Sequence, residues 1–296
     1  MVTGGIPADL QPAYAECLRR ARAHYENFPV ASRLLPAAMR PHVAAVYAFA
    51  RVADDLADEG DAAAAARLAA LDGWRDRLRA AVAGRTDGPQ DADSPVFAAA
   101  AHTIRDHQLD SQLLEDLLDA FAQDVTTTRY GTWQDVLDYC RRSANPVGRL
   151  VLGIAGCRDA AAAASSDALC TALQLTNFWQ DHAIDWARGR LYVPLEEVAV
   201  AGTTLGEFDP ARLTDRWRDV FARVCRRTRH FFEEGRAVCN ATSGRLRLEL
   251  RLTWLGGTTI LDRIERADYD MVHARPRLRA ADFPTLAWRA LRWESR

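Results

Sequence analysis

The sequence predicts an all-α protein that forms one domain over residues 1–296. Alanine, leucine and arginine dominate it, and the alternation of β-branched and polar residues that is typical of half-buried strands is almost absent. Apolar residues recur at helical spacing instead, as Val43, Val46, Tyr47 and Ala50 do. No internal repeat and no low-complexity linker divides the chain. Hydrophobic residues make up 49% of it, which is enough for a sizeable core.

The expected helices lie between proline, glycine and aspartate breaks. Pro41 suits the first turn of a helix, and Asp110 is a candidate N-cap. Thr132 and Asp135 have the spacing of a capping box. Loops are expected at 84–94 and 200–210, and an interruption at 143–146. The predicted helices are 12–25, 41–58, 61–83, 95–107, 110–125, 132–142, a segment ending at 154, 160–186, 211–238, 245–273 and 283–293.

Composition excludes several classes of protein. The net charge of −2 and a pI near 6.4 argue against a general nucleic-acid binder. The sequence has no transmembrane-length apolar run and no signal-peptide pattern, which favours a cytoplasmic protein. The six cysteines form no CxxC pair, so disulfide or zinc frameworks built on them are not expected. The absence of lysine excludes Schiff-base chemistry and a Walker-type phosphate loop.

The downstream stripe consists of Asn177, Asp181 and Asp185, which are four residues apart. Four residues of α-helix advance about 400°, so the three side chains share one face of a helix. Such a stripe is either a solvated polar face or a set of oxygen ligands for a hard cation such as Mg²⁺.

The upstream stripe consists of Asp54, Asp55 and Asp58, with Glu59 beside it and Arg51 before it. Acidic residues at a helix C-terminus are electrostatically unfavourable, because that end already has partial negative charge. A DDxxD pattern on its own is also compatible with a surface feature. Two aspartate-rich stripes in one all-α chain favour walls that hold Mg²⁺ and a diphosphate, whose departure the metal would assist.

At these motifs the chain resembles the squalene and phytoene synthases, which join or rearrange prenyl diphosphates head to head. These proteins have D-D-x-x-D after an arginine, and N-x-x-x-D-x-x-x-D followed by R-G-R-x-Y-x-P. The corresponding residues here are Arg51, the two stripes and the segment 188–194. Matches at Tyr139 and at Tyr269 extend the resemblance over most of the chain.

The resemblance implies an isoprenoid-synthase fold with a central cavity between helices. Five side chains would then bind Mg²⁺: Asp54, Asp58, Asn177, Asp181 and Asp185. Arg51, Arg190 and Tyr269 would contact the substrate diphosphate, because arginine binds phosphate oxygens in a bidentate way. Tyr139 would lie near the reacting carbons, where an aromatic face stabilises a cation. Tyr139, Arg51 and Asn177 are therefore the candidate catalytic residues.

Departures from the commoner motifs indicate a subfamily. Gln180 and Ile184 replace an arginine and a glutamate, and the segments 26–36 and 139–148 are also distinctive. These features are similar to those of the bacterial hydroxysqualene synthases of hopanoid biosynthesis. The implied reaction converts presqualene diphosphate and water to hydroxysqualene and diphosphate. NADPH would not be required, and no dinucleotide-binding motif follows a predicted strand.

Several alternatives stay open at this point. A prenyl transferase of the same fold would make presqualene diphosphate, squalene or phytoene from two prenyl diphosphates, and a non-catalytic relative would serve as a partner protein. His182 and Asn145 are candidates for positioning water, or else a packing residue and a helix cap. Phe28 is either a pocket or a core residue. The tail at 288–293 either rests on the inner membrane or packs against the body. Pathway enzymes are further candidate partners.

Overall fold

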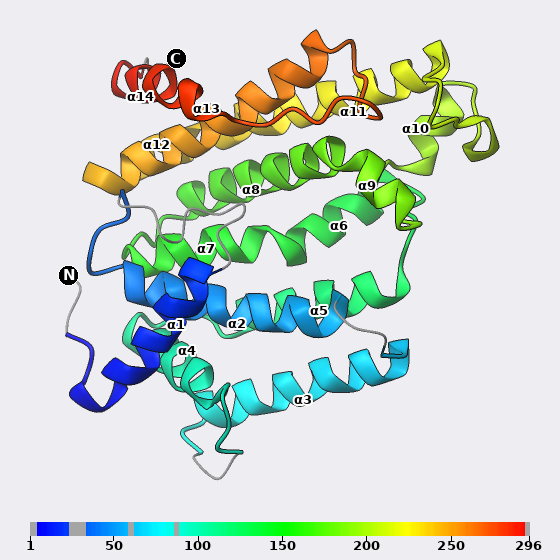
Figure 1. Cartoon of the computed structure of the whole chain (residues 1–296). Helices are drawn as coiled ribbons and strands as arrows, with labels where there is room; N and C mark the ends of the chain where they lie inside the picture. The colour runs from blue at the N-terminus through cyan, green and yellow to red at the C-terminus, as the bar shows by residue number, and fades with distance from the viewer. Residues whose placement is uncertain (1–4, 24–33, 59–61, 86–88, 294–296) are drawn as a thin grey trace. The chain divides into compact units, whose positions relative to one another are not determined.

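The structure is a computed structural model that describes residues 5–23, 34–58, 62–85 and 89–293. The described residues form helices joined by turns, with an isolated β-bridge between Arg129 and Leu191 (Figure 1). The predicted all-α class is therefore confirmed. The chain divides into two compact units, and the single domain over residues 1–296 stays a prediction. The first unit is Met1–Thr126 with Pro146–Ala160, and the second is Thr127–Asn145 with Ala161–Arg296.

Helix α2 is the centre of the first unit and packs against α1, α3, α4 and α5 (Figure 1). Ala44, Ala45 and Ala48 of α2 are fully buried, and their small side chains let neighbouring helices approach closely. Asp110 caps α5 as predicted, because the Gln112 N–H donates to its Oδ1 at 2.9 Å. The helices of this unit are α1 (Gln11–Ala23), α2 (Arg40–Asp58), α3 (Ala64–Val82), α4 (Ser94–Asp106), α5 (Gln112–Thr126) and most of α7 (Asn145–Ile154).

The second unit includes a long pair, α11 and α13, and α14 packs against α13 (Figure 1). A Cβ atom at Gly257 of α13 would lie 2.6 Å from Phe232 and 2.7 Å from Leu173, so only glycine fits this approach. The helices of this unit are α6 (Trp133–Ser143), α8 (Ala160–Gln180), α9 (His182–Ala187), α10 (Leu195–Val200), α11 (Asp215–Glu234), α12 (Val238–Ala241), α13 (Gly244–Arg266) and α14 (Phe283–Leu291).

The predicted capping box at the start of α6 is confirmed. The Asp135 N–H donates to Thr132 Oγ1 at 3.2 Å, and the Thr132 N–H donates to Asp135 Oδ2 at 2.8 Å. The interruption after Ser143 is also present, since Ala144 ends α6 with φ −119°. The helix start follows from local side-chain chemistry, which explains why the sequence was sufficient to place it.

The structure differs from the predicted helices at several places, of which three bear on the site. The helix expected to end at 273 stops at Arg266, because Asp268 and Tyr269 adopt left-handed φ angles of 54° and 57°. The helix expected over 160–186 is divided at Asp181, where φ is −101° and ψ is 9°. Helix α10 was not predicted, and it follows Pro194 directly.

The tail helix α14 has one face packed and one face exposed. Leu286 and Ala290 are buried against Leu255 of α13, so packing against the body accounts for one side. Three large apolar side chains lie on its exposed part: Phe283, Trp288 and Leu291, which are 56%, 56% and 69% exposed. None of the helices in the described ranges is long and apolar enough to cross a bilayer.

Candidate active site

The upstream stripe lies on the last turns of α2 and is paired with an arginine of the same helix. Arg51 Nη2 lies 2.6 Å from Asp55 Oδ1, and Nη1 lies 3.6 Å from Asp54 Oδ2. Ala53 and Ala57 point into the core, whereas Asp58 is exposed at the helix end. The positive charge of Arg51 thus offsets part of the repulsion between these carboxylates and the partial negative charge at the helix C-terminus. Glu59, the fourth acid of this stretch, lies outside the described residues.

A pocket of about 220 Å³ opens beside Arg51 in the first unit. Its lining brings together three guanidinium groups and one carboxylate, a charge balance that suits an anionic group such as a phosphate. The lining residues are Arg19, Arg20, Ala23, Ala48, Arg51, Val52 and Asp55. The distinctive segment 26–33, including Phe28, lies outside the described residues.

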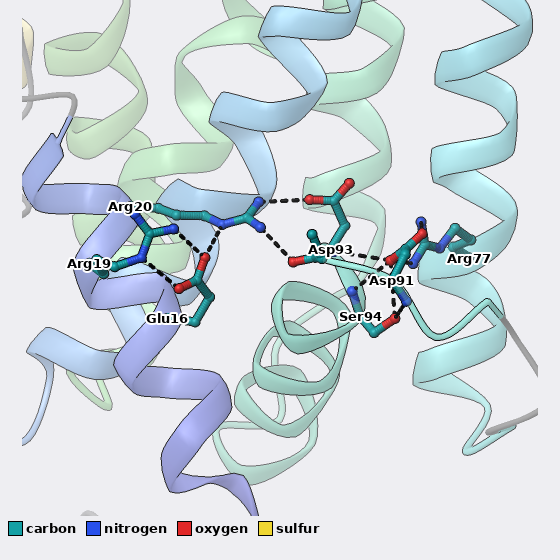
Figure 2. A network of polar contacts seen from close by, with 8 residues as sticks. Glu16, Arg19, Arg20, Arg77, Asp91, Asp93 and Ser94 are labelled. Carbon is teal, nitrogen blue, oxygen red and sulfur yellow. Dashed lines mark hydrogen bonds and ion pairs between the residues drawn. The ribbon is translucent and has the colours of Figure 1, made fainter.

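Figure 2 shows how the two arginines of α1 are held. Glu16 accepts hydrogen bonds from Arg19 Nε at 2.7 Å and from Arg20 Nε at 2.8 Å. Arg20 also donates to Asp93 Oδ1 at 2.8 Å and to the Ala92 carbonyl. The hydrogen bonds from Arg19 and then Arg20 lower the pKa of Glu16 to about 2. Arg20 is therefore fixed by the segment before α4, whereas Arg19 is held within its own helix.

The downstream stripe keeps its helical register across the break at Asp181. The Asp181 N–H donates to the Asn177 carbonyl at 2.9 Å, and the Asp185 N–H donates to the Asp181 carbonyl at 3.0 Å. These two hydrogen bonds keep the three residues one turn apart although α8 ends at Gln180. The shared face that the spacing predicted is present.

The R-G-R segment after the stripe is a Schellman motif that ends α9. Gly189 has φ +77°, the Arg190 N–H donates to the Asp185 carbonyl at 2.8 Å, and the Gly189 N–H donates to Trp186 at 2.9 Å. The glycine is required because a side chain at this φ angle is strained. The motif thereby ties the backbone of Arg190 to the last aspartate of the stripe.

Aromatic rings surround Tyr139 in the second unit. Tyr192 stacks on Phe178 with 3.7 Å between centroids and 3° between planes. Tyr139 lies 5.9 Å from each of these two rings and 5.8 Å from Tyr130. This aromatic cluster (Tyr130, Tyr139, Phe178 and Tyr192) belongs to the same unit as the downstream stripe, and Phe178 is the residue after Asn177 on α8. Its aromatic faces suit the stabilisation of a cation.

The structure adds a partner that sequence reasoning missed. Arg275 Nε lies 2.5 Å from Asp181 Oδ1, and the next residue, Pro276, accepts a hydrogen bond from the Gln180 side chain. The Asp181 side chain is 17% exposed, so a cation is held on a largely enclosed carboxylate. The nearby match at Tyr269 pointed to this stretch of chain but not to a partner of Asp181 that lies 94 residues away.

Three singled-out residues have other surroundings. His182 is buried against Phe208 and Phe221, with 5.4 and 4.8 Å between ring centroids, and takes no position on the stripe. Asn145 accepts a hydrogen bond from Thr171 at 3.0 Å. Burial raises the pKa of Tyr269, whose charged neighbours include Glu265. The assignment of Tyr269 to diphosphate stays a prediction.

The comparisons with known proteins decide the family. The family model of squalene/phytoene synthase matches residues 10–282. The chain belongs to the squalene/phytoene synthase family. The solved squalene synthase HpnC from Alicyclobacillus acidocaldarius has a TM-score of 0.82 at 42% identity, covering 91% of this chain and 99% of that one. The isoprenoid-synthase fold that the motifs implied is therefore shown.

Two relatives of this chain are named for different activities. A hydroxysqualene synthase of Zymomonas mobilis is 39% identical over 185 residues, which cover 62% of this chain and 59% of that protein. A 15-cis-phytoene synthase of Synechococcus elongatus is 31% identical over 296 residues, which cover 96% of this chain and 92% of that protein. This squalene/phytoene synthase family member thus belongs to an enzyme family that acts on prenyl diphosphates.

The residues of the downstream stripe fit the divalent metal that the family uses. Carboxylate and amide oxygens are the ligands that Mg²⁺ prefers. In the structure the Asp181 carboxylate is paired with the Arg275 guanidinium, which a metal ion would have to displace. The upstream stripe likewise supplies only oxygen ligands, and Arg51 already contacts two of its carboxylates. The ligand set of Asp54, Asp58, Asn177, Asp181 and Asp185 stays a prediction.

Proposed function

We propose that this protein is a hydroxysqualene synthase that converts presqualene diphosphate and water to hydroxysqualene and diphosphate in hopanoid biosynthesis. Two features of the second unit support the proposal: the downstream stripe, which keeps one helical face, and the aromatic cluster around Tyr139. The stripe offers oxygen ligands for a metal–diphosphate group, and the cluster offers aromatic faces for a carbocation. Identities of 39% and 36% to two hydroxysqualene synthases support the same choice.

In this proposal the protein binds and orients the diphosphate from both sequence motifs. Arg51, Arg190 and Tyr269 bind its oxygens, and the predicted ligands hold Mg²⁺: Asp54, Asp58, Asn177, Asp181 and Asp185. The metal, when bound, neutralises charge that develops on the leaving diphosphate. The arginines contribute charge-assisted hydrogen bonds to the same oxygens.

The aromatic cluster is assigned to the cation that remains. The C–O bond to diphosphate breaks and its electron pair departs with the leaving group. The resulting cyclopropylcarbinyl cation rearranges beside Tyr139, whose ring face stabilises the positive charge. Water then forms the new C–O bond and loses a proton. This sequence requires no reductant, which matches the expectation that NADPH is not needed.

The test gives purified protein and Mg²⁺ either presqualene diphosphate or farnesyl diphosphate, and identifies the extracted lipids by mass spectrometry. Hydroxysqualene from presqualene diphosphate alone is the expected result. Phytoene synthase relatives that cover most of the chain favour the second candidate, a head-to-head prenyl transferase. Product from farnesyl or geranylgeranyl diphosphate alone would establish that alternative and exclude the first. The absence of diphosphate release from every prenyl substrate would instead favour a non-catalytic partner protein.

The proposal also places the enzyme in the cytoplasm with a peripheral contact at the inner membrane. The exposed side chains Phe283, Trp288 and Leu291 would enter the headgroup region, and Arg289 and Arg292 on the same helix would favour anionic lipid. A product that dissolves in lipid makes this contact useful. Co-sedimentation with anionic vesicles should fall when Trp288 and Leu291 are replaced by serine. Binding that does not change would exclude this role for α14.

A further inference from the structure

Three side chains that suit a transition metal meet in the first unit, between α2 and the end of α4. His42, Asp106 and His107 each offer a ligand atom, and these atoms lie within 4.8 Å of one another. The two imidazole rings are 4.3 Å apart at their centroids and nearly perpendicular, at 80°. His42 and His107 are buried, and Asp106 is partly exposed.

A second layer of hydrogen bonds orients one of these histidines. His42 Nδ1 lies 3.2 Å from Tyr14 Oη and 3.0 Å from Thr103 Oγ1. Tyr14 in turn contacts Thr103 Oγ1 and His102 Nδ1, both at 2.8 Å. Because these contacts engage Nδ1, the Nε2 atom of His42 is the nitrogen left to bind an ion. Metal-binding histidines are commonly oriented in this way through their second nitrogen.

The other histidine presents an unsatisfied nitrogen. The His107 side chain is 8% exposed, and its Nε2 has no hydrogen-bond partner among the described atoms. Asp106 Oδ2 lies 3.6 Å from it, which is beyond hydrogen-bond distance. Arg158 donates to the His107 backbone carbonyl rather than to the ring. A buried polar atom without a partner calls for an explanation, and an ion is one.

We propose that His42, Asp106 and His107 bind a Zn²⁺ ion that links α2 to α4. Two imidazoles and one carboxylate are ligands that zinc accepts, with water in the fourth position. Tetrahedral binding needs ligand atoms about 3.3 Å apart, so the three ligand atoms, now within 4.8 Å of one another, would move closer together through side-chain rotation. Arg158 opposes the added charge, and the Asp106 carboxylate offsets it.

The protonation states of His42 and His107 are also compatible with metal binding. Burial lowers the pKa of His42 to about 4 and also lowers the pKa of His107. Both rings are therefore neutral at pH 7, which is the form that binds metal.

The site is separate from the proposed magnesium ligands of α2. His42 precedes Asp54 by 12 residues on α2, which corresponds to about 18 Å along the helix at 1.5 Å per residue. Zinc and magnesium binding can therefore be measured independently. The proposal does not depend on which prenyl diphosphate the enzyme uses.

The experiment titrates tag-free, chelator-treated full-length protein with ZnCl₂ in excess Mg²⁺, using a chromophoric competitor. One equivalent of Zn²⁺ should bind, and Asp106→Asn and His107→Gln should each weaken binding at least about tenfold. The Asp54→Ala/Asp181→Ala double variant and the exposed-residue control His230→Gln should bind zinc as the unaltered protein does. Co²⁺ should show visible absorption typical of tetrahedral coordination.

Two results would overturn the zinc site. The first is the absence of stoichiometric zinc binding by the unaltered protein. The second is unchanged binding in Asp106→Asn, whose partly exposed, isosteric substitution is compatible with folding even where His107→Gln is not. Zinc loss in the Asp54→Ala/Asp181→Ala double variant would place the ion at the acidic stripes and would also overturn it.

Discussion

The two acidic stripes differ in where their counter-charge comes from. On α2, Arg51 pairs with Asp54 and Asp55, which follow it by three and four residues on the same helix. On the downstream stripe, Asp181 pairs with Arg275, which lies 94 residues further along the chain. The first pairing is a property of helix geometry, whereas the second depends on the path of the chain after α13.

The spacing of residues in the sequence therefore identifies some ion-pair partners and not others. A sequence pattern identifies partners on one helix, because three or four residues bring side chains together whatever the fold. It does not identify a partner that a returning segment supplies. The missed residue, Arg275, is also the one that occupies a proposed metal ligand.

The largest expected effect is the loss of product formation when an aspartate of either stripe is replaced. Asp54→Ala and Asp181→Ala should each lower product formation by about 100-fold or more, because removing one stabiliser of developing charge commonly costs that much. Product is measured by mass spectrometry and folding by circular dichroism. Asp116→Ala, which removes a carboxylate from the exposed face of α5, should leave product formation unchanged. Normal turnover in either stripe variant would contradict the assignment of these aspartates as Mg²⁺ ligands.

Next in size is a change to the turn that follows the downstream stripe. Gly189→Ala should lower the free energy of unfolding by about 1 kcal/mol, because φ of +77° strains a residue with a Cβ atom. Urea denaturation measures this change in the free energy of unfolding. The helical control Gly73→Ala has open space around its Cβ and should be neutral or stabilising. Equal stability of the Gly189 variant would contradict the Schellman motif.

A smaller effect tests the long-range pair directly. Arg275→Gln should tighten Mg²⁺ binding up to about fivefold, since a partly exposed ion pair is worth at most about 1 kcal/mol and its guanidinium competes for Asp181. Isothermal titration calorimetry in the absence of substrate measures the Mg²⁺ affinity of the variant and of the unaltered protein. Arg277→Gln, on the same segment, should bind Mg²⁺ as before. Weaker magnesium binding in Arg275→Gln would mean that the arginine supports the site instead of competing for it.

The smallest expected effect is on the pH dependence of stability. It concerns a pairing within one helix, as that of Arg51 with its aspartates is. Glu16 has a pKa of about 2 beside Arg19 and Arg20, below its unfolded value of 4.5. Its stabilisation is therefore present above pH 4.5 and is lost as the pH falls from 4.5 towards 2. Glu16→Gln should flatten this part of the stability–pH curve, by less than about 1 kcal/mol.

Chemical denaturation at several pH values measures this prediction. The exposed Glu233, which lies 3.9 Å from His230, provides the control Glu233→Gln. A curve for Glu16→Gln that overlays that of the unaltered protein would show that the network in Figure 2 contributes no pH-dependent stability.

Local signals predicted much of the fold. The box at Thr132 and Asp135 and the cap at Asp110 were identifiable because each satisfies backbone groups within three residues. The end of α13 was missed because Asp268 and Tyr269 lack the glycine that usually marks a left-handed turn. The ring neighbours of Tyr139, which are Tyr130, Phe178 and Tyr192, were not predicted, because ring contacts between distant segments leave no periodic pattern.

The sequence by itself determined the family, the all-α class and the residues of both stripes, because helical spacing and motif order are properties of the local chain. Tertiary structure decided that Arg275 neutralises Asp181, that three rings gather around Tyr139, and that His42 meets Asp106 and His107. Each of these groups joins residues from separate segments. Their proximity results from packing and the path of the chain, which no spacing within a single helix encodes.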